Sequence, residues 1–276
     1  MASSRVIKVP LVRKRSRRGK GARHFLRRWH GRIRWTRRKF AAAPRTARIA
    51  VIGAAVLALF SVTNLVYHVA RKPTELLYPV SGSLNKMPAE TWRQYGSLFR
   101  EYSTDAISPE LLAALAQVES AGNPVARTYW RWRLSWNPLA IYQPASSAVG
   151  AYQMTDAAFA DARRYCVRDH AVVESCWFNG LYTRIMPSHA VELTAVSLDR
   201  GVAAILASRP KATPSKRQKE ELATIIHLCG PTAARAFARR GFAAEAGERC
   251  GDHDVAGYLA RVAAMKRAFL RFAAEE

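Results

Sequence analysis

The first 48 residues contain no aspartate or glutamate, although the whole chain has 20 acidic residues and a formal net charge of +24. Arginine and lysine crowd this arm instead, as in the run over residues 13–18. A basic arm of this kind is typical of segments that hold an N-terminus in the cytoplasm and contact anionic lipid. DNA or a cytoplasmic protein could bind the same charges, but specific recognition of nucleic acid is not expected.

Charge of either sign is then missing from Ile49 to Ala70, if His68 is neutral. About 20 apolar residues span the hydrocarbon core of a bilayer, so residues 49–70 predict a transmembrane helix. A cleaved signal peptide would have a shorter basic region and a small-residue cleavage site, and the sequence after the apolar run provides neither. We therefore expect an uncleaved signal anchor behind a cytoplasmic arm over residues 1–48, with everything after Arg71 on the far side of the membrane.

Cysteine is scarce, and none precedes the membrane segment. The four cysteines are Cys166, Cys176, Cys229 and Cys250. An oxidising compartment beyond the membrane permits disulfides. Four cysteines allow three connectivities, and we expect the one that joins sequence neighbours, Cys166 with Cys176 and Cys229 with Cys250. A metal site is the alternative, because His227-x-Cys229 and Cys250-x-x-His253 have ligand-like spacing.

Alternating strand patterns and internal repeats are also missing. Residues 71–90 are rich in proline, glycine and serine and predict a linker. Helical periodicity dominates the remainder, beginning with an aromatic stripe over residues 92–102 that we expect to pack internally. Further helices are expected over 109–121, 155–167, 190–208, 219–228, 231–240 and 253–273. The sequence thus predicts one mainly α-helical domain over residues 91–276, behind an N-terminal transmembrane helix.

One glutamate ends an apolar helix. Ser108 is a good N-cap and Pro109 suits the first helical position, so the helix begins there. Leucines at three-four spacing form a buried stripe that ends at Glu119. Gly122 is a natural stop, which leaves Glu119 in the last turn, where the helix dipole disfavours negative charge. Partial burial and the dipole both favour the protonated form that a general acid needs, whereas the alternative is a solvated glutamate at a helix end.

Two short motifs follow one another at a spacing of about thirty residues. The first is Glu119-Ser120, followed by Asn123-Pro124. The second is Ser-Ala-Val-Gly-Ala-Tyr-Gln-Met over residues 147–154. Their order and spacing resemble the soluble lytic transglycosylase (SLT) family of lysozyme-like enzymes, which cut the glycan strands of bacterial cell wall. The resemblance covers roughly residues 92–270 and implies a lysozyme-like SLT domain.

The resemblance also implies a reaction with one acid. In lytic transglycosylases a glutamate protonates the glycosidic oxygen between N-acetylmuramic acid and N-acetylglucosamine, and then accepts the proton of the muramyl C6 hydroxyl. That hydroxyl closes onto C1 and leaves a 1,6-anhydro end, without water, cofactor or metal. Glu119 would be acid and base in turn. Asp156 and Asp161, the nearest other carboxylates, are better explained as first-turn and exposed-face charges of the next helix.

Other positions take substrate-binding roles from the resemblance. The expected set is Ser120, Ser147, Gly150, Tyr152, Gln153, His227, Tyr258, Trp130 and Trp132. Gln153 would hydrogen-bond sugar, and Gly150 would let the backbone approach it. Tyr152 would pack beside Glu119 or the glycan, or else belong to the core. Ser120 would orient the acid or cap its helix, and Tyr258 would reach back toward the acid, because its segment resembles a late motif of the family.

The chain departs from the family at two places. Ile226-His227-Leu228-Cys229-Gly230-Pro231 stands where the family has Ala-Tyr-Asn-Ala-Gly-Pro, so His227 would replace the tyrosine or be structural. The segment between Pro124 and Ser146 is longer than usual and carries Trp130, Trp132 and further aromatic residues among arginines. Its rings could stack on sugar faces or pack internally.

These observations predict a single-pass inner-membrane protein of a Gram-negative bacterium, with its N-terminus in the cytoplasm and a periplasmic lytic transglycosylase domain. The expected partners are peptidoglycan glycan strands and inner-membrane lipid, with proteins of an envelope complex as further candidates. Two alternatives stay open: a muramidase that hydrolyses the same bond, and a peptidoglycan-binding scaffold whose catalytic site has decayed.

Overall fold

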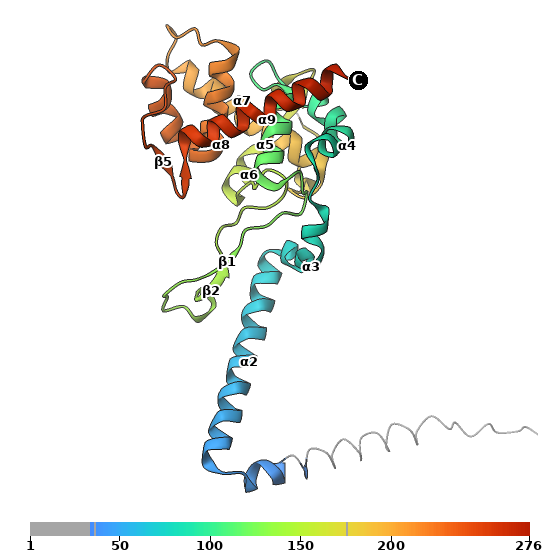
Figure 1. Cartoon of the computed structure of the whole chain (residues 1–276), viewed down its shortest axis with the longest axis vertical. Coiled ribbons are helices and arrows are strands. Elements are labelled where there is room, and N and C mark those ends of the chain that lie inside the picture. The colour runs from blue at the N-terminus through green and yellow to red at the C-terminus, as the bar shows by residue number, and fades with distance from the viewer. Residues whose placement is uncertain (1–33, 36, 175) are drawn as a thin grey trace, which may run out of the picture. The chain divides into compact units, whose positions relative to one another are not determined.

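The computed structural model describes residues 34–35, 37–174 and 176–276 (Figure 1). Most of the basic arm expected over residues 1–48 lies outside these residues. The chain divides into two compact units, Met1–Thr63 and Asn64–Glu276. The second unit holds every site residue that the sequence predicts.

Helix α2 (Arg45–Arg71) contains the charge-free segment and is long and apolar enough to cross a membrane. Large apolar side chains cover its surface, and Ile49 and Leu59 are both about two-thirds exposed. A helix that is apolar all round and unburied by protein is typical of a membrane span. The expected membrane-length helix over residues 49–70 is therefore confirmed.

The segment expected to be a linker, residues 71–90, folds into short helical turns. These are η1 (Pro73–Leu77), α3 (Tyr78–Ser81) and η2 (Gly82–Leu84). The carboxylate of Glu75 is almost fully buried and pairs with Arg127 at 2.7 Å. Because a partner far along the chain holds this segment, the compact unit begins at Asn64 and not at residue 91.

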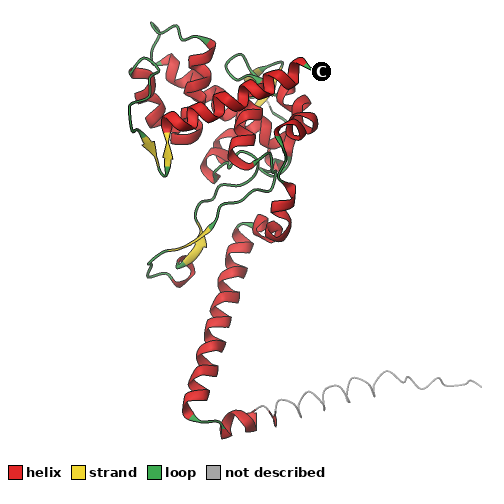
Figure 2. Cartoon of the chain, in the orientation of Figure 1, coloured by secondary structure: helices red, strands yellow, loops and turns green. Residues whose placement is uncertain are grey.

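Helices build the second unit, as the sequence predicts (Figure 2). They are α4 (Pro88–Glu101), α5 (Pro109–Ser120), α6 (Asp156–Ala162), α7 (Pro187–Ala207), α8 (Lys216–Arg239) and α9 (Val255–Ala274). Helix α5 packs against α4 and α9, and its leucine stripe is fully buried. The aromatic stripe of α4 is also in the core, with Trp92 and Phe99 nearly inaccessible.

In the described part of the chain, three two-stranded antiparallel hairpins interrupt the helices. Strand β1 (Trp130–Trp132) pairs with β2 (Tyr142–Pro144), β3 (Cys166–Arg168) with β4 (Ala171–Val173), and β5 (Arg249–Cys250) with β6 (His253–Asp254). The sequence does not predict them, because two or three residues are too few to show an alternating pattern. Helix α6 consequently ends at Ala162, five residues before the expected end at residue 167, so that β3 can begin.

Both expected disulfides are present, Cys166–Cys176 and Cys229–Cys250. The alternative of a metal site is wrong, because the thiols of Cys229 and Cys250 that it needs are bonded to each other. Among the described residues there is also no cluster of three or more metal-binding side chains. The disulfides indicate an oxidising compartment for the second unit.

Candidate active site

Helix α5 holds Glu119 in its last turn. At its start, the Ser108 hydroxyl accepts the backbone N–H of Leu111 at 3.3 Å. At its end, Ala121 and Gly122 both take positive φ, 52° and 65°, and stop the helix. A Cβ on Gly122 would lie 2.4 Å from the Thr91 hydroxyl, so only glycine fits there. The fixed helix end determines where the Glu119 carboxylate projects.

Side chains from two other helices lie beside this carboxylate. The Tyr258 hydroxyl, from α9, donates a hydrogen bond to Glu119 Oε1. His227 Nε2, from α8, lies 3.8 Å from the same oxygen. The Glu119 side chain is 18 % exposed and that of His227 is 15 % exposed. Glu119 is thus partly buried and accessible, and does not point into bulk solvent.

The two neighbours of Glu119 are neutral at neutral pH. Burial raises the pKa of Tyr258 far above its usual value, and the nearby Glu119 charge raises it further. Burial lowers the pKa of His227, which outweighs the opposing effect of Glu119. Among the described residues, Glu119 forms no ion pair with lysine or arginine. A carboxyl group beside neutral polar neighbours can both give and take a proton.

A kink in α8 and a disulfide position His227 and Tyr258. Gly230 has φ 77° and ψ 177°, a conformation that glycine alone adopts readily, and Pro231 begins the second half of α8. The expected pair of helices, 219–228 and 231–240, is this kinked α8. The disulfide from Cys229 ties the kink to the β5–β6 hairpin, which leads into α9. Two segments distant in sequence are thereby joined beside Glu119.

Ser120 connects the first motif to the second. Its hydroxyl is 2.8 Å from the carbonyl oxygen of Ala151 and 3.0 Å from that of Ala116. The alternatives for Ser120 were to orient the acid or to cap the helix. The Ser120 hydroxyl contacts the backbone instead of Glu119, so Ser120 joins the end of α5 to the second motif, and its expected contact with substrate stays a prediction.

Two residues of the second motif face the protein interior. Gly150 has φ 84°, and a Cβ there would lie 2.2 Å from the Arg184 carbonyl oxygen. The close approach of the Arg184 backbone therefore requires glycine at this position, and the expected approach of substrate to Gly150 stays a prediction. Tyr152 is 1 % exposed, and its hydroxyl has no hydrogen-bond partner. The core-packing alternative is correct for Tyr152, because a side chain this buried does not reach a glycan.

Gln153 and Ser147 make local contacts. The Gln153 amide nitrogen donates to the carbonyl of Gly150 at 2.9 Å, within its own turn, and the side chain is half-buried. The Ser147 hydroxyl accepts the backbone N–H of Asp156 at 3.2 Å. Arg184 Nη1 donates to the Ser147 and Met154 carbonyls, an anchoring role that no sequence pattern predicts. Among the described residues, no hydrogen bond or ion pair joins Gln153, Ser147 or Arg184 to Glu119.

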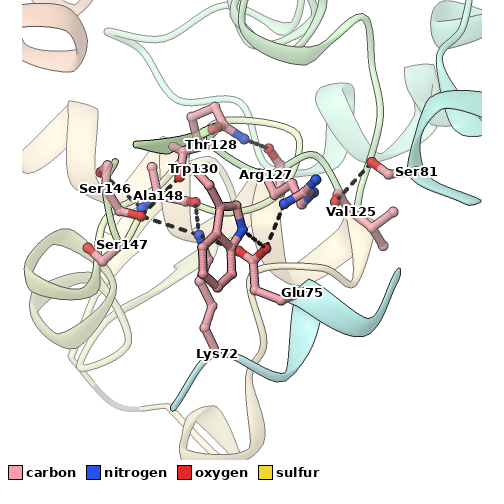
Figure 3. A network of polar contacts seen from close by, with 12 residues as sticks. Lys72, Glu75, Ser81, Val125, Arg127, Thr128, Trp130, Ser146, Ser147 and Ala148 are labelled. Carbon is pink, nitrogen blue, oxygen red and sulfur yellow. Dashed lines mark hydrogen bonds and ion pairs between the residues drawn. The ribbon is translucent and has the colours of Figure 1, made fainter. Parts of the chain in front are cut away.

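Trp130 and Trp132 lie on the β1–β2 hairpin and have different surroundings. Trp130 donates from Nε1 to Glu75 Oε2 at 2.8 Å (Figure 3). Its ring also meets the His68 ring edge to face. Trp132 is 72 % exposed, and its ring packs on that of Tyr142, with ring centroids 4.6 Å apart. Trp130 therefore packs against the protein, which is one of the two roles expected for these rings, and no hydrogen bond among the described residues joins either ring to Glu119.

Of the nine expected substrate-binding residues, the structure brings His227 and Tyr258 to the acid, and joins Ser120 to the second motif behind it. The others support the fold locally or lie on the hairpin. No protein-family model matches this chain, and no curated protein shows significant similarity to it.

Proposed function

We propose that this protein is a membrane-anchored peptidoglycan lytic transglycosylase with a lysozyme-like domain. It would cleave the β-1,4 bond between N-acetylmuramic acid and N-acetylglucosamine and leave 1,6-anhydro ends. The observation that carries the proposal is the partly buried Glu119 carboxyl, held by the Tyr258 hydroxyl beside His227, at the end of the motif that resembles the family.

One carboxyl group, that of Glu119, carries out both proton transfers of the proposed reaction. The Glu119 proton passes to the glycosidic oxygen as the bond from that oxygen to C1 breaks. The muramyl C6 oxygen then bonds to C1, and its proton passes to the Glu119 carboxylate, which regenerates the acid. The Tyr258 hydroxyl would stabilise the carboxylate between these steps, because it donates to Oε1 and remains protonated.

The neighbouring carboxylates support a single-acid reaction. Asp156 is exposed and pairs with Arg184 at 2.7 Å. Asp161 pairs with Arg200 at 2.9 Å and with Arg164. Glycosidases with two catalytic carboxylates place both groups across one bond, whereas these two aspartates pair with arginines on the surface. Glu119 is therefore the catalytic carboxyl that the proposal uses.

The same proposal includes the location. Helix α2 would cross the inner membrane once with the basic arm in the cytoplasm, following the positive-inside rule. The second unit would then be periplasmic, in agreement with its two disulfides.

A catalytically decayed peptidoglycan-binding scaffold is the second candidate. The second motif favours this candidate, because Gly150 and Tyr152 face the protein interior. The two candidates differ in whether the Glu119 carboxyl is needed to cut cell wall.

A zymogram with Glu119→Gln separates them. The variant keeps the size of the side chain and removes the acid, so clearing should fall by about 10²–10⁴-fold. Glu110→Gln, at the opposite end of the same helix, is the matched control and should clear like the wild type. Equal clearing by wild type and Glu119→Gln would refute the catalytic assignment, and a wild type that binds cell wall without clearing it would favour the scaffold.

A further inference from the structure

The β1–β2 hairpin, residues 129–145, exposes large apolar side chains that none of the described residues cover. Trp136 and Leu134 at its tip are fully exposed, Trp132 is 72 % exposed and Tyr129 is 66 % exposed. Arg131 and Arg133 alternate with these residues and are also exposed. A patch of this kind marks a surface that another apolar phase or molecule covers.

The base of the hairpin is held firmly to the chain that follows α2. The buried Glu75 carboxylate accepts hydrogen bonds from Trp130 Nε1 and Arg127 Nη1, at 2.8 and 2.7 Å, and pairs with Lys72 at 3.4 Å (Figure 3). Lys72 also donates to the Ala148 carbonyl at 2.9 Å. The base is therefore fixed within a few residues of the end of the apolar helix.

The outer part of the hairpin contacts the last two turns of α2, which belong to the same compact unit. Asn64 Nδ2 donates to the Tyr142 carbonyl at 2.7 Å. His68 Nε2 lies 2.8 Å from the Leu139 carbonyl oxygen. These contacts lie four residues apart on α2, which corresponds to about 6 Å along the helix. The hairpin thus lies beside the helix end and does not project away from it.

The same turns of α2 coincide with the expected membrane boundary. If about 20 residues from Ile49 cross the hydrocarbon core, the chain leaves it near residue 68. Tyr67 accepts a hydrogen bond from Arg71 Nη1 at 2.7 Å, an aromatic and basic pair typical of the headgroup region. A hairpin attached to Asn64 and His68 is therefore at the depth of the lipid headgroups.

We propose that the hairpin inserts its exposed rings into the headgroup layer of the membrane that α2 crosses. Tryptophan and tyrosine prefer this layer because one end of each ring system is apolar and the other is polar. Arg131 and Arg133 would pair with the phosphates of anionic phospholipids, since a guanidinium binds phosphate in a bidentate way. The protein would then hold the membrane at two places, through α2 and through the hairpin.

The proposal rests on α2 crossing the membrane and does not require catalysis by Glu119. A hairpin that bound glycan would not need to contact the helix at its membrane boundary. The zymogram and the experiment below can therefore fail independently.

Tryptophan fluorescence of the full chain in nanodiscs tests the proposal. The nanodiscs contain phosphatidylglycerol and a phosphatidylcholine brominated near the headgroup end of its acyl chains. Phenylalanine keeps the apolar ring but removes most of the emission, so Trp132→Phe and Trp136→Phe should each lose part of the bromine-quenched signal. Trp177→Phe, which removes a 78 % exposed tryptophan outside the hairpin, should leave the quenched signal unchanged.

The arginines supply a second readout. The double change Arg131→Glu and Arg133→Glu should reduce quenching of the hairpin tryptophans and remove its dependence on phosphatidylglycerol. Unchanged quenching in both Trp132→Phe and Trp136→Phe would overturn the proposal. A shift of the hairpin emission on adding soluble glycan fragments, without quenching by brominated lipid, would assign the surface to glycan instead.

Discussion

At the scale of single residues, the site consists of a carboxyl group and two neutral neighbours. Tyr258 Oη and His227 Nε2 lie beside the same oxygen of Glu119, although both residues are more than a hundred positions farther along the chain. Each can stabilise one protonation state of the acid without a permanent charge. This arrangement suits a group that gives and later receives the same proton.

Tyr258→Phe should lower the rate of cell-wall cleavage by about 10- to 100-fold. The reason is the loss of a hydrogen bond to a charged group, worth about 1.5–3 kcal/mol, when Glu119 is ionised. Tyr182→Phe is the control, because it removes a hydrogen bond to Glu192 instead. Turnover assays on the two variants measure the effect, and full activity in Tyr258→Phe would contradict it.

His227 should make the folded state sensitive to acid. Burial lowers its pKa from about 6.5, so below pH 6.5 the unfolded chain takes up a proton before the folded chain does. The stability linked to His227 is therefore complete above pH 6.5 and is lost as the pH falls through the lowered folded-state pKa. His227→Gln should show a smaller fall of thermal midpoint between pH 7 and pH 5 than the wild type. Because His189 also has a lowered pKa, the difference between the two proteins is the relevant quantity. Identical pH dependence would refute the role.

The sequence predicts residues better when their role is local. The position of Glu119 follows from a cap, a stripe and a stop within fifteen residues, and all three are present. The direction in which Gly150 and Tyr152 face is not predictable in this way. It depends on Arg184 and on the core, and a short motif has the same letters whether it faces substrate or protein.

At the scale of elements, glycine geometry fixes the second motif. Gly150→Ala should lower the free energy of unfolding by about 1–3 kcal/mol, because the new methyl group meets the Arg184 carbonyl and the backbone has positive φ. Gly247→Ala has a similar φ of 74° but open space around it, and should cost less. Urea unfolding of the two variants separates the clash from the backbone strain. Equal losses would show that packing against Arg184 contributes nothing.

The two disulfides should have different effects on activity. Replacing Cys229 and Cys250 by serine should lower cleavage as well as stability, because this disulfide joins the elements that carry His227 and Tyr258. Replacing Cys166 and Cys176 should lower stability alone. Each loss of stability is expected at about 2–4 kcal/mol. Thermal midpoints report the stability of each variant, and activity is compared at a temperature where all the proteins are folded. Equal activity in both double variants would contradict the positioning role.

Several elements could not be predicted from the sequence, for physical reasons. The three hairpins are too short for a period to be visible. Residues 71–90 have the composition of a linker but fold because Glu75 finds Arg127 and Trp130 more than fifty residues away. Composition reports only local tendency, whereas a buried ion pair depends on partners that the chain brings together on folding.

At the scale of the whole molecule, the chain combines a membrane-length helix with a disulfide-containing helical unit. The charge distribution predicts the membrane helix and its orientation, and the structure confirms the length and apolar character of that helix. The predicted orientation places the residues after Arg71 in the periplasm. Protease added to spheroplasts should then cleave the second unit and spare a tag at the N-terminus. Cleavage of the tag alone would show the opposite orientation.

The central claim is that Glu119 cleaves glycan strands without water. Digestion of purified peptidoglycan in ¹⁸O-labelled water, followed by mass spectrometry, tests it most directly. We predict that the full chain releases 1,6-anhydro products without label, and that Glu119→Gln releases none. Products that carry one ¹⁸O at the reducing end, or equal release by Glu119→Gln, would contradict the account.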